Sequence, residues 1–127
     1  MKKEDQVCSF EQAREFERRN IFFDTEKVWV LNRRKDSPVL MTKEEFFNLL
    51  QPYAGFIAPN VAELGDIFIR TGFGNALPYK NKDNGDKWEM PDLLYEADST
   101  LTEAQARADA FIWLIKNGFV NPKKLKL

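Results

Sequence analysis

Residues 102–118 have the sequence TEAQARADAFIWLIKNG, and this stretch is the clearest predicted helix of the chain. Thr102 and Gln105 form a capping box at its start, and Asn117-Gly118 is typical of a helix end. The apolar side chains between these ends fall within about 100° of arc at about 3.6 residues per turn. They are Ala104, Ala108, Phe111, Ile112 and Ile115. We therefore expect a helix over residues 102–117 that turns this face to the core.

Trp113 lies on the opposite face of the predicted helix, about 180° from Ala104, with Ala106 and Ala110 beside it. A tryptophan flanked by alanines has the shape of an interface anchor. Two interpretations stay open. In one, the helix is sandwiched between a sheet and a second helix. In the other, Trp113, Ala106 and Ala110 contact a protein partner or a second copy of the chain.

Outside this helix, capping boxes and short apolar runs predict both helices and strands. Ser9 with Gln12, Thr42 with Glu45 and Asn60 with Glu63 open three further helices. Short strands are expected over 21–23, 27–31, 39–41, 79–80, 87–90 and 93–95, and 53–57 is a linker or a strand. Because no regular βαβ alternation occurs, we expect an α+β fold. It would be a small, mostly antiparallel sheet packed with three to four short helices, in one domain over 1–127 with flexible tails at 1–7 and 121–127.

The composition excludes most catalytic chemistry. The 127 residues include no histidine and one cysteine, Cys8, so there is no Ser-His-Asp triad, His-ligated zinc site or internal disulfide. We expect Cys8 to be a buried thiol before the first helix. The longest apolar run, 110–115, is far below the ~18 residues of a membrane span. These features predict a cytoplasmic, non-enzymatic protein with no cofactor and no membrane partner.

Two charged clusters support alternative functions. Arg14, Arg18 and Arg19 on the first helix, with Arg33, Arg34 and Lys35 in a later turn, would form a nucleic-acid patch if helix and turn lie side by side. Glu11 and Glu15 share that helix, so a self-paired solvated surface is the competing interpretation. Glu89, Asp92, Glu96 and Asp98 could hold Mg²⁺ in a carboxylate-metal enzyme. The competing interpretation is an acidic loop before a helix N-terminus.

Three segments, taken in order, resemble a group of small proteins from Bacteroidetes phages and prophages. They are VCSFEQA at 7–13, IAPNVAELG at 57–65, and EAQARA at 103–108 followed by LIKNG at 114–118. The chain departs from that group mainly over 70–101. The resemblance implies a phage-borne or mobile-element origin and hence the cytoplasm of a bacterial host. It brings no known activity, so no site residue is transferred from it.

The leading hypothesis is a non-enzymatic module that binds a protein partner or associates with itself through the Trp113 face. Eleven phenylalanines, with adjacent pairs at 22–23 and 46–47, favour it weakly, because adjacent side chains cannot all face one core. Nucleic-acid binding is the second hypothesis, since the net charge of −1 leaves only local basic patches for it. A carboxylate-metal enzyme is the third.

Overall fold

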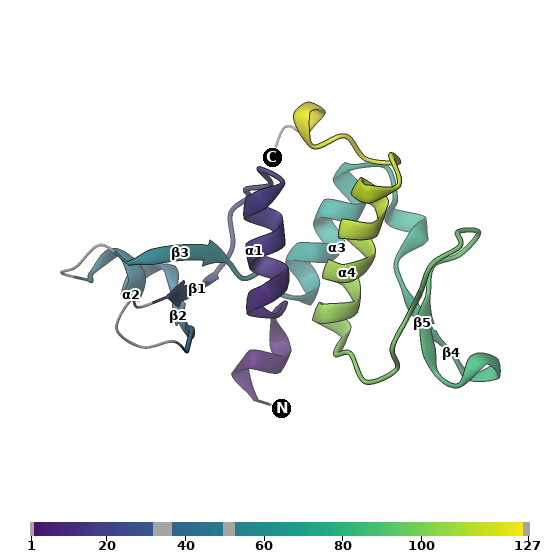
Figure 1. The fold of residues 1–127 in the computed structure, drawn as a ribbon, viewed down its shortest axis with the longest axis horizontal. Helices are drawn as coiled ribbons and strands as arrows, with labels where there is room; N and C mark the ends of the chain where they lie inside the picture. The colour runs from purple at the N-terminus through teal and green to yellow at the C-terminus, as the bar shows by residue number, and fades with distance from the viewer. Residues whose placement is uncertain (1, 32–36, 50–52, 126–127) are drawn as a thin grey trace.

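The computed structural model describes residues 2–31, 37–49 and 53–125, and its α-helices and β-strands confirm the α+β fold class (Figure 1). The strands of the described residues form two antiparallel three-stranded sheets. The α-helices are α1 (Phe10–Arg18), α2 (Lys43–Phe47), α3 (Val61–Arg70) and α4 (Glu103–Lys116). The strands are β1 (Lys27–Leu31), β2 (Val39–Thr42), β3 (Ala54–Ile57), β4 (Tyr79–Asn81), β5 (Lys87–Glu89) and β6 (Glu96–Ala97). Short 3-10 helices are η1 (Lys3–Gln6), η2 (Gly74–Ala76), η3 (Lys82–Asn84) and η4 (Pro122–Lys124).

Each α-helix begins where its predicted capping box lies. The side chains of Ser9, Thr42, Asn60 and Thr102 accept from the backbone N–H three residues on, and the reciprocal bond is present in each case. A capping box satisfies two of the N–H groups that a helix start leaves without intrahelical partners. The predicted helix starts are therefore confirmed.

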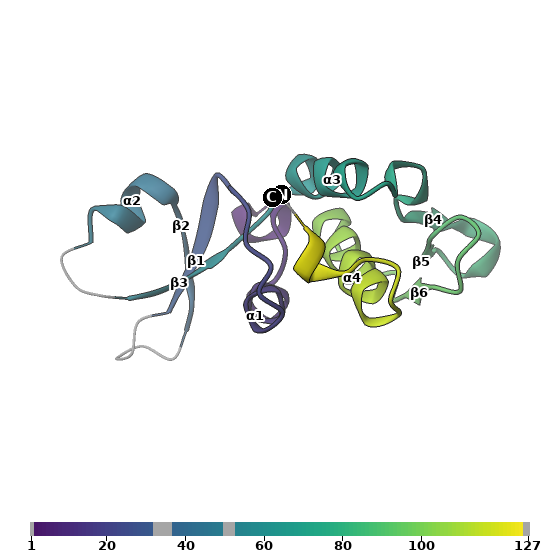
Figure 2. The same cartoon turned by 90° about the horizontal axis from the view of Figure 1, so that it is seen from above.

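The first sheet has β1 at its centre, with β2 and β3 on either side. Trp29 pairs with Leu40 on one side and with Phe56 on the other, so these three side chains share one face. Phe10 of α1 packs edge-on against Trp29 and Phe56 on this face. Figures 1 and 2 show this sheet and α2 at one end of the molecule, with α1 between them and the other helices.

The second sheet is the meander β4-β5-β6 at the opposite end. The predicted Asn84-Gly85 turn joins β4 to β5, with Gly85 at a φ of 64°. Buried Trp88 in β5 donates from Nε1 to the carbonyl of Leu101 just before α4, at 3.1 Å. This bond ties the second sheet to the start of α4.

α4 is the centre of the core. It packs against α1, α3 and η1, and its buried residues occur on all sides. They are Ala104, Ala106, Ala108, Ala110, Phe111, Ile112, Leu114 and Ile115. The helix packs chiefly against other helices rather than between a sheet and a second helix, and its second apolar face is buried at Ala106 and Ala110 but only half-buried at Trp113.

Two strand predictions differ from the structure. Residues 21–23 form no strand, because α1 ends in a turn that places Asn20 at a φ of 57° and bonds the Ile21 N–H to the Phe16 carbonyl at 2.9 Å. The strand predicted at 93–95 lies instead at Glu96–Ala97. Of the linker and the strand predicted for 53–57, the structure has the strand, over residues 54–57.

The ends of the described chain contact the rest of the fold. Val7 is 2% exposed and forms a β-bridge with Asn60, and Leu125 packs against the core. The flexibility predicted for 1–7 and 121–127 stays a prediction. Of the helices in the described part of the chain, none has the length and apolar character needed to cross a membrane.

Candidate protein-interaction surface

The predicted interface residues on α4 have different surroundings. Ala106 and Ala110 are fully buried at 0% exposure, so neither can touch a partner in this fold. Their small side chains lie on a helix that is packed from several sides, where close approach of neighbours favours alanine. Trp113 is half-buried and packs against the core. Of the three residues, Trp113 alone reaches the surface.

Trp113 lies between two other aromatic rings. Its ring centroid is 5.8 Å from that of Tyr95, at an interplanar angle of 64°, and 5.6 Å from that of Phe119, at 16°. Offset stacking and edge-to-face contacts at such distances are the preferred aromatic geometries. Trp113 is therefore held by the residue that precedes β6 on one side and by the residue that follows Gly118 on the other.

Phe119 is positioned by the way α4 ends. Gly118 has a φ of 78°, and the Phe119 N–H donates to the Leu114 carbonyl at 2.9 Å. This is the pattern of a Schellman cap, in which the residue after the glycine turns back over the last helical turn. The predicted stop at Asn117-Gly118 is thus confirmed, and the cap brings the Phe119 ring onto Trp113.

Phe73 is positioned in the same way at the end of α3. Gly72 has a φ of 87°, and the Phe73 N–H donates to the Phe68 carbonyl at 2.7 Å. The Phe73 and Phe119 rings meet edge-on, 6.2 Å apart at an interplanar angle of 83°. Two helices that pack side by side therefore end in equivalent caps whose phenylalanines touch.

We define the aromatic surface as Ile69, Phe73, Trp113 and Phe119. Ile69, in the last turn of α3, is 65% exposed, and its side chain lies against Gly74, the residue after Phe73. Phe119 is 48% exposed, while Phe73 and Trp113 are half-buried. An exposed phenylalanine stacked on a half-buried tryptophan, with another exposed apolar side chain at the end of the neighbouring helix, is typical of protein interfaces.

The hydrogen bond between Tyr95 and Asp109 helps to fix the position of Trp113 in this surface. The Tyr95 hydroxyl donates to an Asp109 carboxylate oxygen at 2.6 Å. Burial, together with this bond and the negative charge of Asp109, raises the pKa of Tyr95 above its usual value. The phenol therefore stays protonated and keeps donating, which holds the ring against Trp113.

The structure describes three of the six residues of the predicted nucleic-acid patch, Arg14, Arg18 and Arg19. Arg18 and Arg19 both pair with Glu15, at 3.1 Å and 2.7 Å. Arg14 lies over the Phe10 ring, with its guanidinium carbon 5.8 Å from the ring centroid. Arg33, Arg34 and Lys35 lie outside the described residues, so the proposed side-by-side placement of helix and turn stays untested.

The predicted acidic cluster is only partly brought together. Glu89 and Glu96 are cross-strand neighbours in the second sheet, and the Asn84 amide donates to both. Asp98 instead accepts from the backbone N–H and the hydroxyl of Thr100, which lowers its pKa. Within residues 2–31, 37–49 and 53–125, no three His, Cys, Asp or Glu residues form a group that could hold a metal ion.

Cys8 is buried, as predicted, in the segment that leads into α1. Its carbonyl accepts from Trp29 Nε1 at 2.9 Å, and its N–H donates to the Pro59 carbonyl at 3.0 Å. Burial and the nearby charge of Glu63 raise the pKa of the thiol above its usual value. Because the thiolate is the reactive form, Cys8 is poorly suited to act as a nucleophile.

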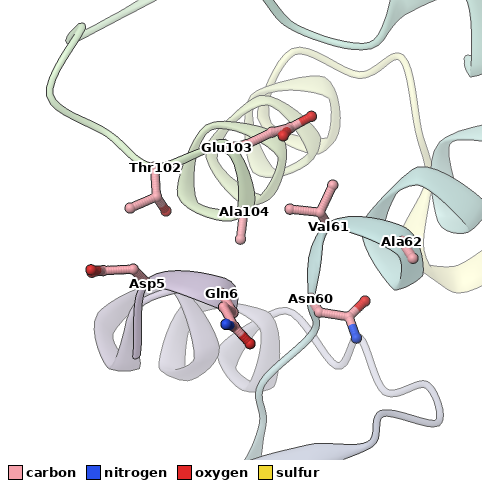
Figure 3. A pocket seen from close by; sticks show the side chains of 8 residues that line it. All are labelled: Asp5, Gln6, Asn60, Val61, Ala62, Thr102, Glu103 and Ala104. Atoms are coloured by element: carbon pink, nitrogen blue, oxygen red, sulfur yellow. The ribbon is translucent and has the colours of Figure 1, made fainter. Parts of the chain in front are cut away.

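A cavity of about 520 Å³ lies where η1 meets the first turns of α3 and α4 (Figure 3). Val61, Ala62 and Ala104 form apolar parts of its wall, and Asp5 and Glu103 bring carboxylates to it. Arg107, behind the wall, donates to the Val61 carbonyl at 2.8 Å and to Glu103 at 3.2 Å. Glu103 is therefore paired with Arg107 within α4, while the buried Nε of Arg107 has no hydrogen-bond partner among the described residues.

Comparison with protein-family models, with curated proteins and with solved structures gives no match for this chain.

Proposed function

We propose that this protein is a non-enzymatic binding module that recognises another protein, or a second copy of itself, through the aromatic surface. The observation that carries the proposal is the position of Phe119. This ring is 48% exposed, stacks on Trp113 and meets Phe73 edge-on. A large apolar ring held in one orientation loses little conformational freedom when a partner covers it, so less of the free energy gained by its burial is offset by ordering.

The resemblance to the phage and prophage group supports an origin in a mobile element. A protein made in that setting meets the proteins of a bacterial host, and we propose that one of them is the partner. A lysate of a Bacteroidetes host is therefore the first place to search for it.

Phe119 is a better test residue than Trp113. Trp113 packs against the core, so Trp113→Asp would lower the stability of the fold as well as change the surface. Phe119→Asp places a charge on a half-exposed ring position that follows the helix. Phe47→Asp is the matched control, because Phe47 is 75% exposed on α2, at the other end of the molecule.

The experiment is a pull-down with the tagged chain, identified by mass spectrometry and repeated with nuclease, together with the molar mass of the purified chain in solution. We expect a stoichiometric protein that survives nuclease, or a dimer, and we expect Phe119→Asp to remove it while Phe47→Asp keeps it. Replacing a central aromatic anchor of an interface costs about 2 kcal/mol or more, which is roughly a thirtyfold loss of affinity. A partner or dimer that Phe119→Asp retains would refute the proposal.

A further inference from the structure

Basic side chains gather where the C-terminal ends of α1 and α4 lie near each other, and we call this the basic surface. Figures 1 and 2 show the C-terminal ends of these two helices on the same side, with η4 passing across them. The basic surface consists of Arg18 and Arg19 at the end of α1, Lys116 at the end of α4, and Lys123 in η4. It shares no residue with the aromatic surface.

A cavity of about 470 Å³ opens on this surface. Its lining combines cations and amides over an apolar floor, namely Arg19, Lys123, Asn20, Asn121, Ile115 and Pro122. The chain segments that line it are about 100 residues apart in the sequence, so the tertiary fold alone creates it.

Arg19, the arginine that lines this cavity, uses only part of its hydrogen-bond donors within the described residues. Arg19 gives its Nε–H to Glu15 at 2.7 Å, and no described residue accepts from its two Nη groups. A guanidinium presents its donors as a planar fork that matches the oxygens of a phosphate group. Arg19 is therefore held in place by Glu15 while the outer part of the fork remains available.

Among the described acidic residues, Glu15 alone forms an ion pair with a cation of this surface. Glu15 pairs with both Arg18 and Arg19, and its pKa is lowered chiefly by Arg19, with Arg18 and Lys116 also contributing. No ion pair forms at Lys116 or Lys123 within the described part of the chain, and both side chains are exposed. Cations in the last turn of a helix favour its C-terminus, which accounts for Arg18 and Lys116. It does not account for Arg19 and Lys123 lining one open cavity.

We propose that this basic surface binds the phosphate backbone of a single-stranded nucleic acid. Arg19 and Lys123 would hold phosphate oxygens, and the Asn20 and Asn121 amides offer hydrogen bonds to sugars or bases. In this proposal, a base stacks on the ring of Phe22, which is 56% exposed and follows Asn20 by two residues in the sequence. Cations that follow the backbone, combined with an exposed aromatic ring, are the usual elements of single-strand binding.

The test is fluorescence anisotropy with labelled oligo-dT and oligo-U of about 20 nucleotides, at salt concentrations from about 50 mM upward. We expect binding that weakens steeply as salt rises. The double variant Lys116→Glu with Lys123→Glu should weaken it about tenfold or more and lower the salt slope by about 0.7 per lost phosphate contact. Phe22→Ala should weaken it severalfold with the slope unchanged, because stacking releases no counterions.

The matched control is Lys82→Glu with Lys87→Glu, which makes the same change in net charge on exposed residues of η3 and β5, away from the ends of α1 and α4 (Figure 1). It should leave the affinity within about twofold, since charges beyond the Debye length of about 10 Å are screened. Three results would overturn the proposal. These are no binding at the lowest salt, an equal loss in the control, or equal binding of polyglutamate, which has neither phosphates nor bases.

Discussion

Tyr95 is the residue that connects the second sheet to the middle of α4. Its ring packs against Trp113, and its hydroxyl donates to Asp109. Tyr95→Phe keeps the ring but leaves a half-buried carboxylate without this donor, so we expect the free energy of unfolding to fall by about 1–3 kcal/mol. Urea denaturation measures this change. Tyr79→Phe, at a 45% exposed position, serves as the control and should change stability by less than about 0.5 kcal/mol.

Glu15 makes stability depend on pH. Its pKa is lowered from the ordinary 4.5, so the charged form is favoured in the folded state. The stabilisation is complete above the unfolded pKa and is lost as the pH falls through the lower, folded pKa. We expect Glu15→Gln to cost about 0.5–1 kcal/mol at pH 7, the range of partly exposed ion pairs, and almost nothing at about pH 2.

Thermal melts of wild type and Glu15→Gln at the two pH values test this directly. Glu103→Gln is a useful comparison, because Glu103 forms one i,i+4 ion pair, with Arg107, whereas Glu15 pairs with two arginines. If the difference in melting temperature between wild type and Glu15→Gln were the same at both pH values, the role assigned to these ion pairs would be contradicted.

At the scale of elements, the helix ends position the surface residues. α3 and α4 end in the sequences Thr71-Gly72-Phe73 and Asn117-Gly118-Phe119, and each glycine has a positive φ. Gly118→Ala forces a side chain into the left-handed region, which costs about 1–2 kcal/mol. Since the same cap places Phe119 on Trp113, we expect this variant to lose partner binding as well as stability.

A substitution at Asn20 should change stability in the opposite direction. Asn20 occupies the position after α1 that Gly118 occupies after α4, and its φ is 57°. Asn20→Gly relieves the left-handed backbone, so its stability should match or slightly exceed that of the wild type. Urea denaturation of Gly118→Ala and Asn20→Gly measures the change in the free energy of unfolding for each variant. An Ala at 118 that is as stable as the wild type would show that the cap does not hold this geometry.

At the scale of the whole molecule, the core lies where α1, α3 and α4 meet, and the two sheets lie at opposite ends. Cys8 is in this core at 0% exposure, between β1 and the segment before α3. Its thiol should therefore react with iodoacetamide at least about 100-fold more slowly in the native protein than in urea. Mass spectrometry of timed samples gives the rate. Rapid labelling of the native chain would mean that α1 separates easily from the core.

Local sequence patterns were sufficient for the helix starts, for the stop of α4 and for the fold class. Capping boxes and glycine stops depend on residues within one turn of each other, so their meaning does not change with the rest of the fold. The same reasoning could have found Phe73, because Gly72-Phe73 follows α3 as Gly118-Phe119 follows α4. Strand boundaries were less certain, since 21–23 has the composition of a strand but closes the end of α1.

The candidate surfaces depended on contacts between distant segments. The helical arc put Ala106, Ala110 and Trp113 on one face, but it could not tell that the two alanines are covered while Trp113 reaches the surface. That outcome depends on which elements pack against α4, and packing of this kind joins residues far apart in the chain. Likewise, Phe73 contacts Phe119, and Arg19 and Lys123 line the same cavity, because elements distant in the sequence lie next to each other. Sequence spacing describes one element at a time, whereas both surfaces are made where two elements end together.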